Sequence, residues 1–112
     1  MLTPGDVVEL DLGAPAGSEA GSRRPALVVT AARVLRGGPN VVQVVPLTRT
    51  IRRSGAEVVI DPDDGNGLGV RSSAQCQHVR SVAKSRIYAS TGNVGPVILG
   101  EVRETLALFL DL

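Results

Sequence analysis

The stretch PALVVTAARVLRGGPNVVQVVPL, residues 25–47, contains two apolar, β-branched runs that are separated by a turn. The runs cover residues 25–30 and 41–47, and short runs bounded by turn residues are typical of buried strands. Pro25 is tolerated because it stands at the first residue of its strand. Residues 37–40, GGPN, favour a turn. We therefore expect two antiparallel strands, joined through this turn, at the centre of the fold.

Shorter runs outside this pair predict four more strands. These strands are expected over residues 7–12, over 57–60, within 70–82 and within 88–94. The composition of residues 13–22, rich in Gly, Ala, Ser and Pro, predicts a long loop, and residues 61–69 predict a turn-rich link.

The end of the chain changes to a helical period. Pro96 suits the first position of a helix, because its missing N–H costs nothing there. Apolar residues then recur at helical spacing, which predicts an amphipathic helix over about residues 96–110. A chain of 112 residues has the size of one domain, and we expect residues 1–112 to form it. Strands followed by a helix indicate a mainly β fold, a small twisted sheet or partly open barrel with a helix packed on it.

The chain holds one cysteine, Cys76, and one histidine, His78. One cysteine excludes an intramolecular disulfide, which favours a reducing, cytoplasmic compartment. The first residues lack the features of a signal peptide, and no apolar run approaches the roughly 20 residues of a membrane span, so we expect no membrane contact. One His and one Cys do not supply a closed zinc site. Asp61, Asp63 and Asp64 leave a carboxylate metal site open, although such a cluster is more often a turn.

The net charge is only +1, but the charged residues are unevenly distributed. Residues 23–54 contain seven arginines and no acid, and a second acid-free block holds Arg71, Arg80, Lys84 and Arg86. Arginine suits bidentate contacts with phosphate. The blocks therefore indicate an anionic partner, with nucleic acid as the first choice. Surface arginines that reflect only a biased composition are an equally good interpretation of this feature by itself.

Several familiar catalytic motifs are missing, among them the Gly-x-x-x-x-Gly-Lys phosphate loop and the Gly-x-Ser-x-Gly nucleophile elbow. We expect His78 on a strand, where a lone histidine is more often a polar strand residue than a general base. Cys76 would share one face of that strand with His78, but the geometry is poor for a nucleophile and its base. Cys76 is expected to be a small buried residue.

If the two central strands pair antiparallel, Arg24 and Thr48 come to the same end of the sheet. A fixed cation beside a hydroxyl suits the cleavage of RNA, because the 2′-hydroxyl of the substrate can itself be the nucleophile. Arginine can stabilise the charge that develops on the phosphorane, and threonine can hydrogen-bond a non-bridging oxygen. From the pattern alone, a surface arginine and a strand-end threonine remain the simpler interpretation.

Five segments, taken together, resemble the MazF/PemK family of toxin endoribonucleases. These segments are Gly5-Asp6-Val7-Val8, Gly17-Ser18-Glu19, Arg24-Pro25-Ala26-Leu27-Val28-Val29, Pro46-Leu47-Thr48, and Val79-Arg80-Ser81-Val82 with Lys84-Ser85-Arg86-Ile87. No single segment is specific, but their order and spacing match over nearly the whole chain, which ends in Leu106-Ala107-Leu108-Phe109-Leu110.

The resemblance implies an SH3-like, twisted antiparallel barrel with a C-terminal helix, working as a homodimer. It also implies the toxin of a type II toxin–antitoxin pair, which cuts single-stranded RNA at short sequences, independently of the ribosome and without a metal or other cofactor. The products would be a 2′,3′-cyclic phosphate and a 5′-hydroxyl. A cognate antitoxin would cover the RNA groove with a disordered tail, and an acidic tail would suit the basic blocks.

The resemblance also assigns roles to residues. The catalytic pair of the family maps onto Arg24 and Thr48, and the segment with Ser18 and Glu19 matches a mobile loop beside the RNA site. The basic blocks supply further expected RNA contacts at Arg23, Arg49, Arg52, Arg80 and Arg86. The first strand has Val7 and Val8 where many relatives carry aromatic residues, which weakens the expectation of aromatic base stacking. Gln77-His78 stands where relatives usually have an acid followed by Gln.

Two other functions stay open at this point. The gyrase-poisoning toxin CcdB has a similar fold but binds a protein target and cuts no RNA, and the presence of Arg24 and Thr48 argues against that function here. A non-catalytic RNA-binding domain would use the basic blocks alone.

Overall fold

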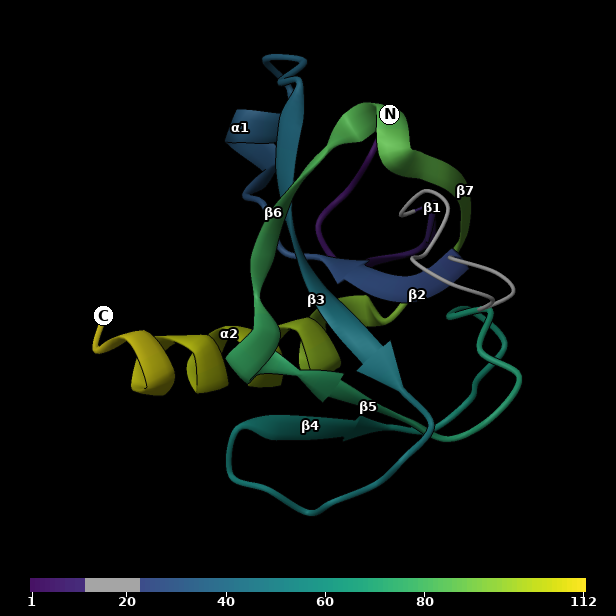
Figure 1. Ribbon diagram of the computed structural model, residues 1–112, viewed down its shortest axis with the longest axis vertical. Coiled ribbons are helices and arrows are strands. Elements are labelled where there is room, and N and C mark those ends of the chain that lie inside the picture. Colours follow the sequence, from purple (N-terminus) through teal and green to yellow (C-terminus); the bar gives the residue numbers. More distant parts are fainter. Residues whose placement is uncertain (12–22) are drawn as a thin grey trace, which may run out of the picture.

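The computed structural model describes residues 1–11 and 23–112, which form an antiparallel sheet with a long C-terminal helix (Figure 1). The strands are β1 (Asp6–Asp11), β2 (Arg23–Val28), β3 (Val41–Thr48), β4 (Glu57–Ile60), β5 (Ser72–Gln75), β6 (Arg80–Ala83) and β7 (Ile87–Asn93). The α-helices are α1 (Ala32–Leu35) and α2 (Gly95–Leu110), and the 3₁₀ turns are η1 (Cys76–His78) and η2 (Lys84–Arg86).

Strand β3 organises the sheet because both of its edges are paired. One edge pairs with β2, while the other pairs first with β6 and then, at Leu47 and Thr48, with β5. The order is β4-β5-β3-β2-β1-β7, and β6 adds to β3 beside this path. In the described residues no pairing joins β4 to β7. The mainly β fold with a C-terminal helix is confirmed, in the form of a curled sheet that does not close into a barrel.

The central strands bury side chains on both faces. Val28 and Val44 belong to one apolar cluster, together with Val8. Leu27 and Val45, which adjoin Val28 and Val44 in sequence, belong to the other cluster. The second cluster fills the space between the sheet and α2, to which the helix contributes Leu99, Val102 and Leu106. Burial on both faces explains why these strands read as continuous apolar runs rather than as an alternation.

The expected pair of central strands is present, with one addition between them. Leu27 lies opposite Val45 in an antiparallel register, as the sequence predicts. The connection contains the single helical turn α1, which buries Leu35 and precedes the predicted turn. Helix α2 starts at Gly95, one residue before the predicted start, and ends at Leu110 as predicted. No helix in the described part of the chain is long and apolar enough to cross a membrane.

The single strand expected within residues 70–82 is wrong, because that segment forms β5, η1 and β6. Leu47 pairs with Ala74 and Val44 pairs with Arg80, so two residues of β3 face five of the neighbouring segment. Pro46 is one of these two residues and has no N–H to offer the ladder. The surplus residues form the 3₁₀ turn η1, which buries Cys76.

The link before β5 is a tight, well-anchored turn. The Asp63 carboxylate accepts hydrogen bonds from the backbone N–H groups of Gly65 and Asn66, both at 2.8 Å. The buried Asn66 amide bonds the backbone at Asp61, Asp63 and Leu68. This link lies so close to β7 that a Cβ on Gly92 would sit 2.4 Å from the Asn66 carbonyl carbon. Residues after Asn66 are thereby fixed beside the sheet.

Gly92→Ala is expected to lower the free energy of unfolding by about 2 kcal/mol or more, because the methyl group meets backbone that cannot move alone. Gly69→Ala is the matched control, since nothing lies within 4 Å of a Cβ at that position. It should change stability by less than about 0.5 kcal/mol. Urea unfolding of both variants checks the difference, and equal midpoints would contradict the close approach of link and strand.

Candidate functional site

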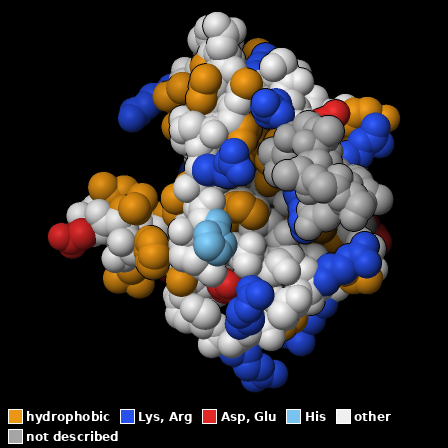
Figure 2. Space-filling view, in the orientation of Figure 1, with side chains coloured by type: hydrophobic (Ala, Val, Ile, Leu, Met, Phe, Trp, Pro, Cys, Tyr) orange, Lys and Arg blue, Asp and Glu red, His pale blue; other side chains and the backbone are white. Residues whose placement is uncertain are grey.

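A cleft of about 720 Å³ opens where β2 and β3 separate. Its walls come from the first half of β2, the end of β3 with the residues that follow, and the link before β5. Residues from β1, β5, β6 and β7 complete the lining, among them Glu9, Ser72, Gln75, Arg80 and Thr91. Figure 2 shows Lys and Arg side chains spread over the face that is viewed there, with few acidic side chains among them. The cleft, which Arg23, Arg24, Arg49 and Arg80 line, therefore carries the basic character that the sequence predicts.

Pro25 accounts for the end of the pairing between the strands. The β2–β3 pairing runs only from Val28 opposite Val44 to Ala26 opposite Pro46. Val29 donates to the Gln43 carbonyl, and hydrogen-bonded pairs alternate along an antiparallel ladder, so the next donor toward β3 after Leu27 would be residue 25. Pro25 has no backbone N–H and cannot donate. Beyond this point β3 continues with β5 as its partner, and β2 continues with β1. The two strands diverge, and the cleft is the space between them.

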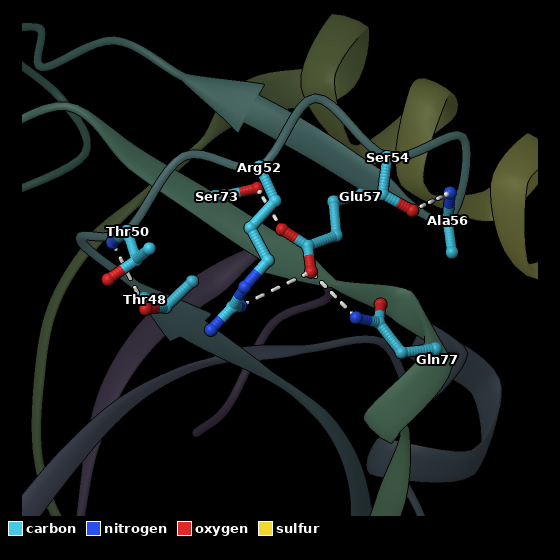
Figure 3. Close-up of polar contacts among 8 residues, drawn as sticks. All are labelled: Thr48, Thr50, Arg52, Ser54, Ala56, Glu57, Ser73 and Gln77. Carbon is cyan, nitrogen blue, oxygen red and sulfur yellow. Dashed lines mark hydrogen bonds and ion pairs between the residues drawn. The ribbon is translucent and has the colours of Figure 1, made fainter.

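Arg24 and Thr48 lie at this divergence and line the same cleft. Ala26 and Pro46 are opposite each other, and side chains two residues away point to the same face of each strand. Arg24 and Thr48 are therefore on one face, one on each side of the opening. Arg24 is exposed and Thr48 is half-buried. The Thr48 hydroxyl accepts a hydrogen bond of 3.1 Å from the Thr50 N–H, so its own hydrogen is available to a ligand (Figure 3).

A buried carboxylate lies behind this end of β3. The side chain of Glu57, the first residue of β4, is only 1% exposed. It accepts hydrogen bonds from the Ser73 hydroxyl at 2.9 Å and from the Gln77 amide at 2.6 Å (Figure 3). The Arg52 guanidinium lies 3.8 Å away. Since Ser73 is also the residue opposite Thr48 on β3, the Glu57 cluster supports the strand end that carries the threonine.

Two opposing effects act on the pKa of Glu57. Burial is the larger single effect and raises the pKa, because the charged form loses water. The hydrogen bonds from Gln77 and Ser73, the charge of Arg52 and a bond from Gln75 together outweigh it. The pKa of Glu57 is therefore below its usual value, and the side chain is ionised near neutral pH. The sequence analysis does not single out Glu57, because its burial follows from the pairing of β4 with β5 and no local pattern indicates it.

The cleft gathers some of the predicted RNA-binding residues but not all. Arg23, Arg49 and Arg80 line it together with the predicted pair. Arg52 pairs with Glu57 instead, and Arg86 donates a 3.4 Å hydrogen bond to the Asp11 carbonyl oxygen; neither lines the cleft. Ser18 and Glu19 lie outside the described residues.

The expectation that Cys76 and His78 share one face of a strand is wrong. Both belong to η1, where Cys76 is 0% exposed and His78 is exposed. The Cys76 sulfur lies 4.0 Å from the Val102 carbonyl oxygen, and burial raises the pKa of its thiol to about 11. Cys76 is thus the small buried residue that the sequence predicts, and it has none of the character of a nucleophile.

The acidic residues of the link before β5 form the predicted turn. Asp63 bonds the backbone of that turn, and Asp61 pairs with Arg71 at 3.0 Å. Nowhere in residues 1–11 and 23–112 do three or more His, Cys, Asp or Glu side chains gather in a group that could hold a metal ion.

Glu57→Gln is expected to lower the free energy of unfolding at neutral pH by about 1–3 kcal/mol, because the buried donors lose a charged acceptor. Because the pKa of Glu57 is lower in the folded protein than in the unfolded chain, its ionised form stabilises the fold at pH values above the unfolded-state pKa of 4.5. This stabilisation is lost as the pH falls through the folded-state pKa. The difference between parent and variant should therefore shrink from about pH 7 to about pH 3. Urea unfolding across this range is the measurement. The exposed Glu104→Gln is the control, and a difference independent of pH would exclude an ionised Glu57.

Several known proteins are similar to this chain in sequence or in fold. Endoribonuclease MazF9 of Mycobacterium tuberculosis is 35% identical over 116 residues, which cover 100% of this chain and 98% of the relative. A mycobacterial endoribonuclease in complex with its cognate antitoxin is similar at 25% identity and a TM-score of 0.79, over 100% of this chain and 97% of that one. A chain of a MazE–MazF crystal structure from Deinococcus radiodurans is similar at 29% identity and a TM-score of 0.79, over 97% and 95% of the two chains.

The model of the family described as "PemK-like, MazF-like toxin of type II toxin-antitoxin system" matches residues 3–110. Three findings indicate the same family. They are the order of the segments in the sequence, the fold, and the similarity to these relatives. The protein belongs to the PemK-like, MazF-like toxin family of type II toxin–antitoxin systems.

Proposed function

We propose that this chain is an endoribonuclease that cleaves single-stranded RNA in the cleft between β2 and β3. The observation that carries the proposal is the presence of Arg24 and Thr48 on one face of this cleft, on opposite sides of the strand divergence. Family membership and the endoribonuclease relative support it. We propose further that cleavage is selective for a short sequence and independent of the ribosome.

The proposed reaction is attack of a ribose 2′-hydroxyl on the adjacent phosphorus. The 2′-hydroxyl gives up its proton to solvent as the new O–P bond closes a 2′,3′-cyclic phosphate. The bond to the 5′-oxygen breaks, and that oxygen takes up a proton from solvent and leaves as a 5′-hydroxyl. Arg24 would neutralise the charge that grows on the non-bridging oxygens, because a guanidinium offers permanent charge and several N–H donors. Thr48 would donate its hydroxyl hydrogen to one of these oxygens. Preorganised donors of this kind require no metal.

Further basic residues would hold the RNA strand on either side of the reacting phosphate. Arg49 follows Thr48 directly, and Arg80 enters the same cleft from β6. Their contacts would go to the phosphate backbone and carry little sequence information. We propose Arg23 as the third contact, Ser18 and Glu19 as neighbours of the site, and a smaller role for Arg52 and Arg86, which do not line the cleft.

We also propose a homodimer, a cytoplasmic location and an antitoxin partner. The last turns of α2 project beyond the sheet (Figure 1) and expose several large apolar side chains side by side, which is typical of an interaction surface. The exposed side chains there are Leu108, Phe109, Leu110 and Leu112. A second subunit or the antitoxin would cover them. An acidic antitoxin segment would be attracted to the basic cleft.

Arg24→Ala is expected to lower kcat about 100- to 1000-fold, the usual loss when one donor to a developing oxyanion is removed. Thr48→Ala should lose activity in the same direction. The measurement is cleavage of a long single-stranded RNA in the presence of EDTA, with the 5′ ends mapped by primer extension. Cuts at one recurring short sequence with 5′-hydroxyl ends are the expected result.

The control is Arg33→Ala, since Arg33 is an exposed arginine of α1 that does not line the cleft. It should cleave like the parent. A folded Arg24→Ala variant that cleaves at the parental rate would disprove the assignment of Arg24. Intact RNA with the parent protein, over a wide panel of sequences, would favour a toxin that binds a protein target.

A further inference from the structure

Tyr88 is an exposed aromatic residue beside the cleft that the proposed mechanism does not use. It is the only tyrosine in a chain without tryptophan, and it is 59% exposed. The guanidinium carbon of Arg23 lies 3.6 Å from the centre of its ring. Arg23 itself lines the cleft. The ring therefore lies against a residue of the cleft wall, the one that precedes Arg24, without itself lining the cleft.

A β-bulge places Tyr88 in this position. Leu10 of β1 pairs with Ile87 and Glu9 pairs with Ala89, so Tyr88 is the extra residue of β7 at this irregularity. Thr91 is the extra residue of the second irregularity, between Ser90 and Gly92, and it lines the cleft. Bulges turn a side chain away from its regular direction and occur often beside functional sites. Both bulges of β7 thus present their extra residue at or near the cleft.

The contact with Arg23 leaves one side of the ring available. A guanidinium at 3.6 Å covers one face of Tyr88, so the remaining exposure comes from the other face and the ring edge. A tyrosine ring with a stacked arginine is held in place and loses little conformational freedom on binding a further flat group. The group that fits such a surface beside a phosphate-binding cleft is a nucleobase.

We propose that Tyr88, held by Arg23, is a base-stacking subsite for the RNA strand at the rim of the cleft. Arg24 and Arg23 are neighbours on β2, and their side chains point to opposite faces of the strand. Arg24 would contact the reacting phosphate. The Arg23 guanidinium would fix the stacking surface with its face and keep its edge N–H groups for the RNA backbone. This proposal rests on the proposed function, because it places RNA in the same cleft.

The test uses the fluorescence of the single tyrosine. The probe is a pool of single-stranded oligonucleotides of random sequence whose sugars are all 2′-O-methylated, so that no 2′-hydroxyl can attack. Stacking of a base on Tyr88 should quench its emission. A matched oligonucleotide with abasic sites keeps the phosphates and should quench far less. Tyr88→Trp repeats the measurement at wavelengths that nucleic acids do not absorb.

Variants measure the contribution of the ring to binding. Tyr88→Leu removes the aromatic surface and should weaken binding of the probe roughly tenfold, as expected for the loss of one stacked base. On cleavable RNA it should raise KM by a similar factor and leave kcat within about twofold, because remote binding is lost equally in ground and transition states. Tyr88→Phe keeps the ring and should restore parental binding. Thermal unfolding checks that each variant is folded, which the exposure of the residue favours.

The possible outcomes separate this proposal from the proposed function. RNA cleavage by the parent with no quenching, together with an unchanged KM in Tyr88→Leu, would overturn the stacking subsite and leave the ribonuclease intact. Quenching and a weakened Tyr88→Leu variant, without cleavage of any natural RNA, would support the subsite and refute the ribonuclease. Equal loss of affinity in Tyr88→Phe and Tyr88→Leu would also overturn stacking, because the hydroxyl rather than the ring would then carry the contact.

Discussion

The β2–β3 ladder stops at Pro25, and the arrangement of the site depends on that stop. Pro25 stands where the next hydrogen bond of the ladder would form, and it has no N–H to donate. Strand β3 therefore changes partner from β2 to β5 while β2 remains paired with β1. The strands diverge with Arg24 on one and Thr48 on the other. A continuous ladder would bring these strands together and leave no space for a substrate.

Some of the arginines around the opening line the cleft, and another pairs with a buried acid. Arg24, Arg49 and Arg80 line the cleft, where a polyanion would meet them. Arg52 instead pairs with the buried Glu57, which also accepts hydrogen bonds from Ser73 and Gln77. An ionised acid held in this way stabilises β4, β5 and the turn η1 as one unit. The negative charge in this part of the molecule is thus compensated internally, and the charge presented to a ligand stays positive.

Local patterns in the sequence were sufficient for the central strands and the C-terminal helix, but not for the division of residues 70–82 or for all contacts between elements. The apolar runs around residues 25–47 predict β2 and β3, and Pro96 predicts the start of α2, because burial and helix capping act on neighbouring residues. The split of β5 from β6 follows from pairing with the far end of β3, which no local pattern records. Glu57 was missed for the same reason, since its burial depends on strand register. The bulge at Tyr88 depends on the pairing of β7 with β1.

We expect RNA to occupy the opening between β2 and β3. The decisive measurement is a crystal structure of this protein with a single-stranded RNA that carries 2′-O-methyl groups. A backbone phosphate should lie between the Arg24 guanidinium and the Thr48 hydroxyl, within hydrogen-bond distance of both. RNA bound along α2 or over the outer strands, with the opening between β2 and β3 empty, would contradict it.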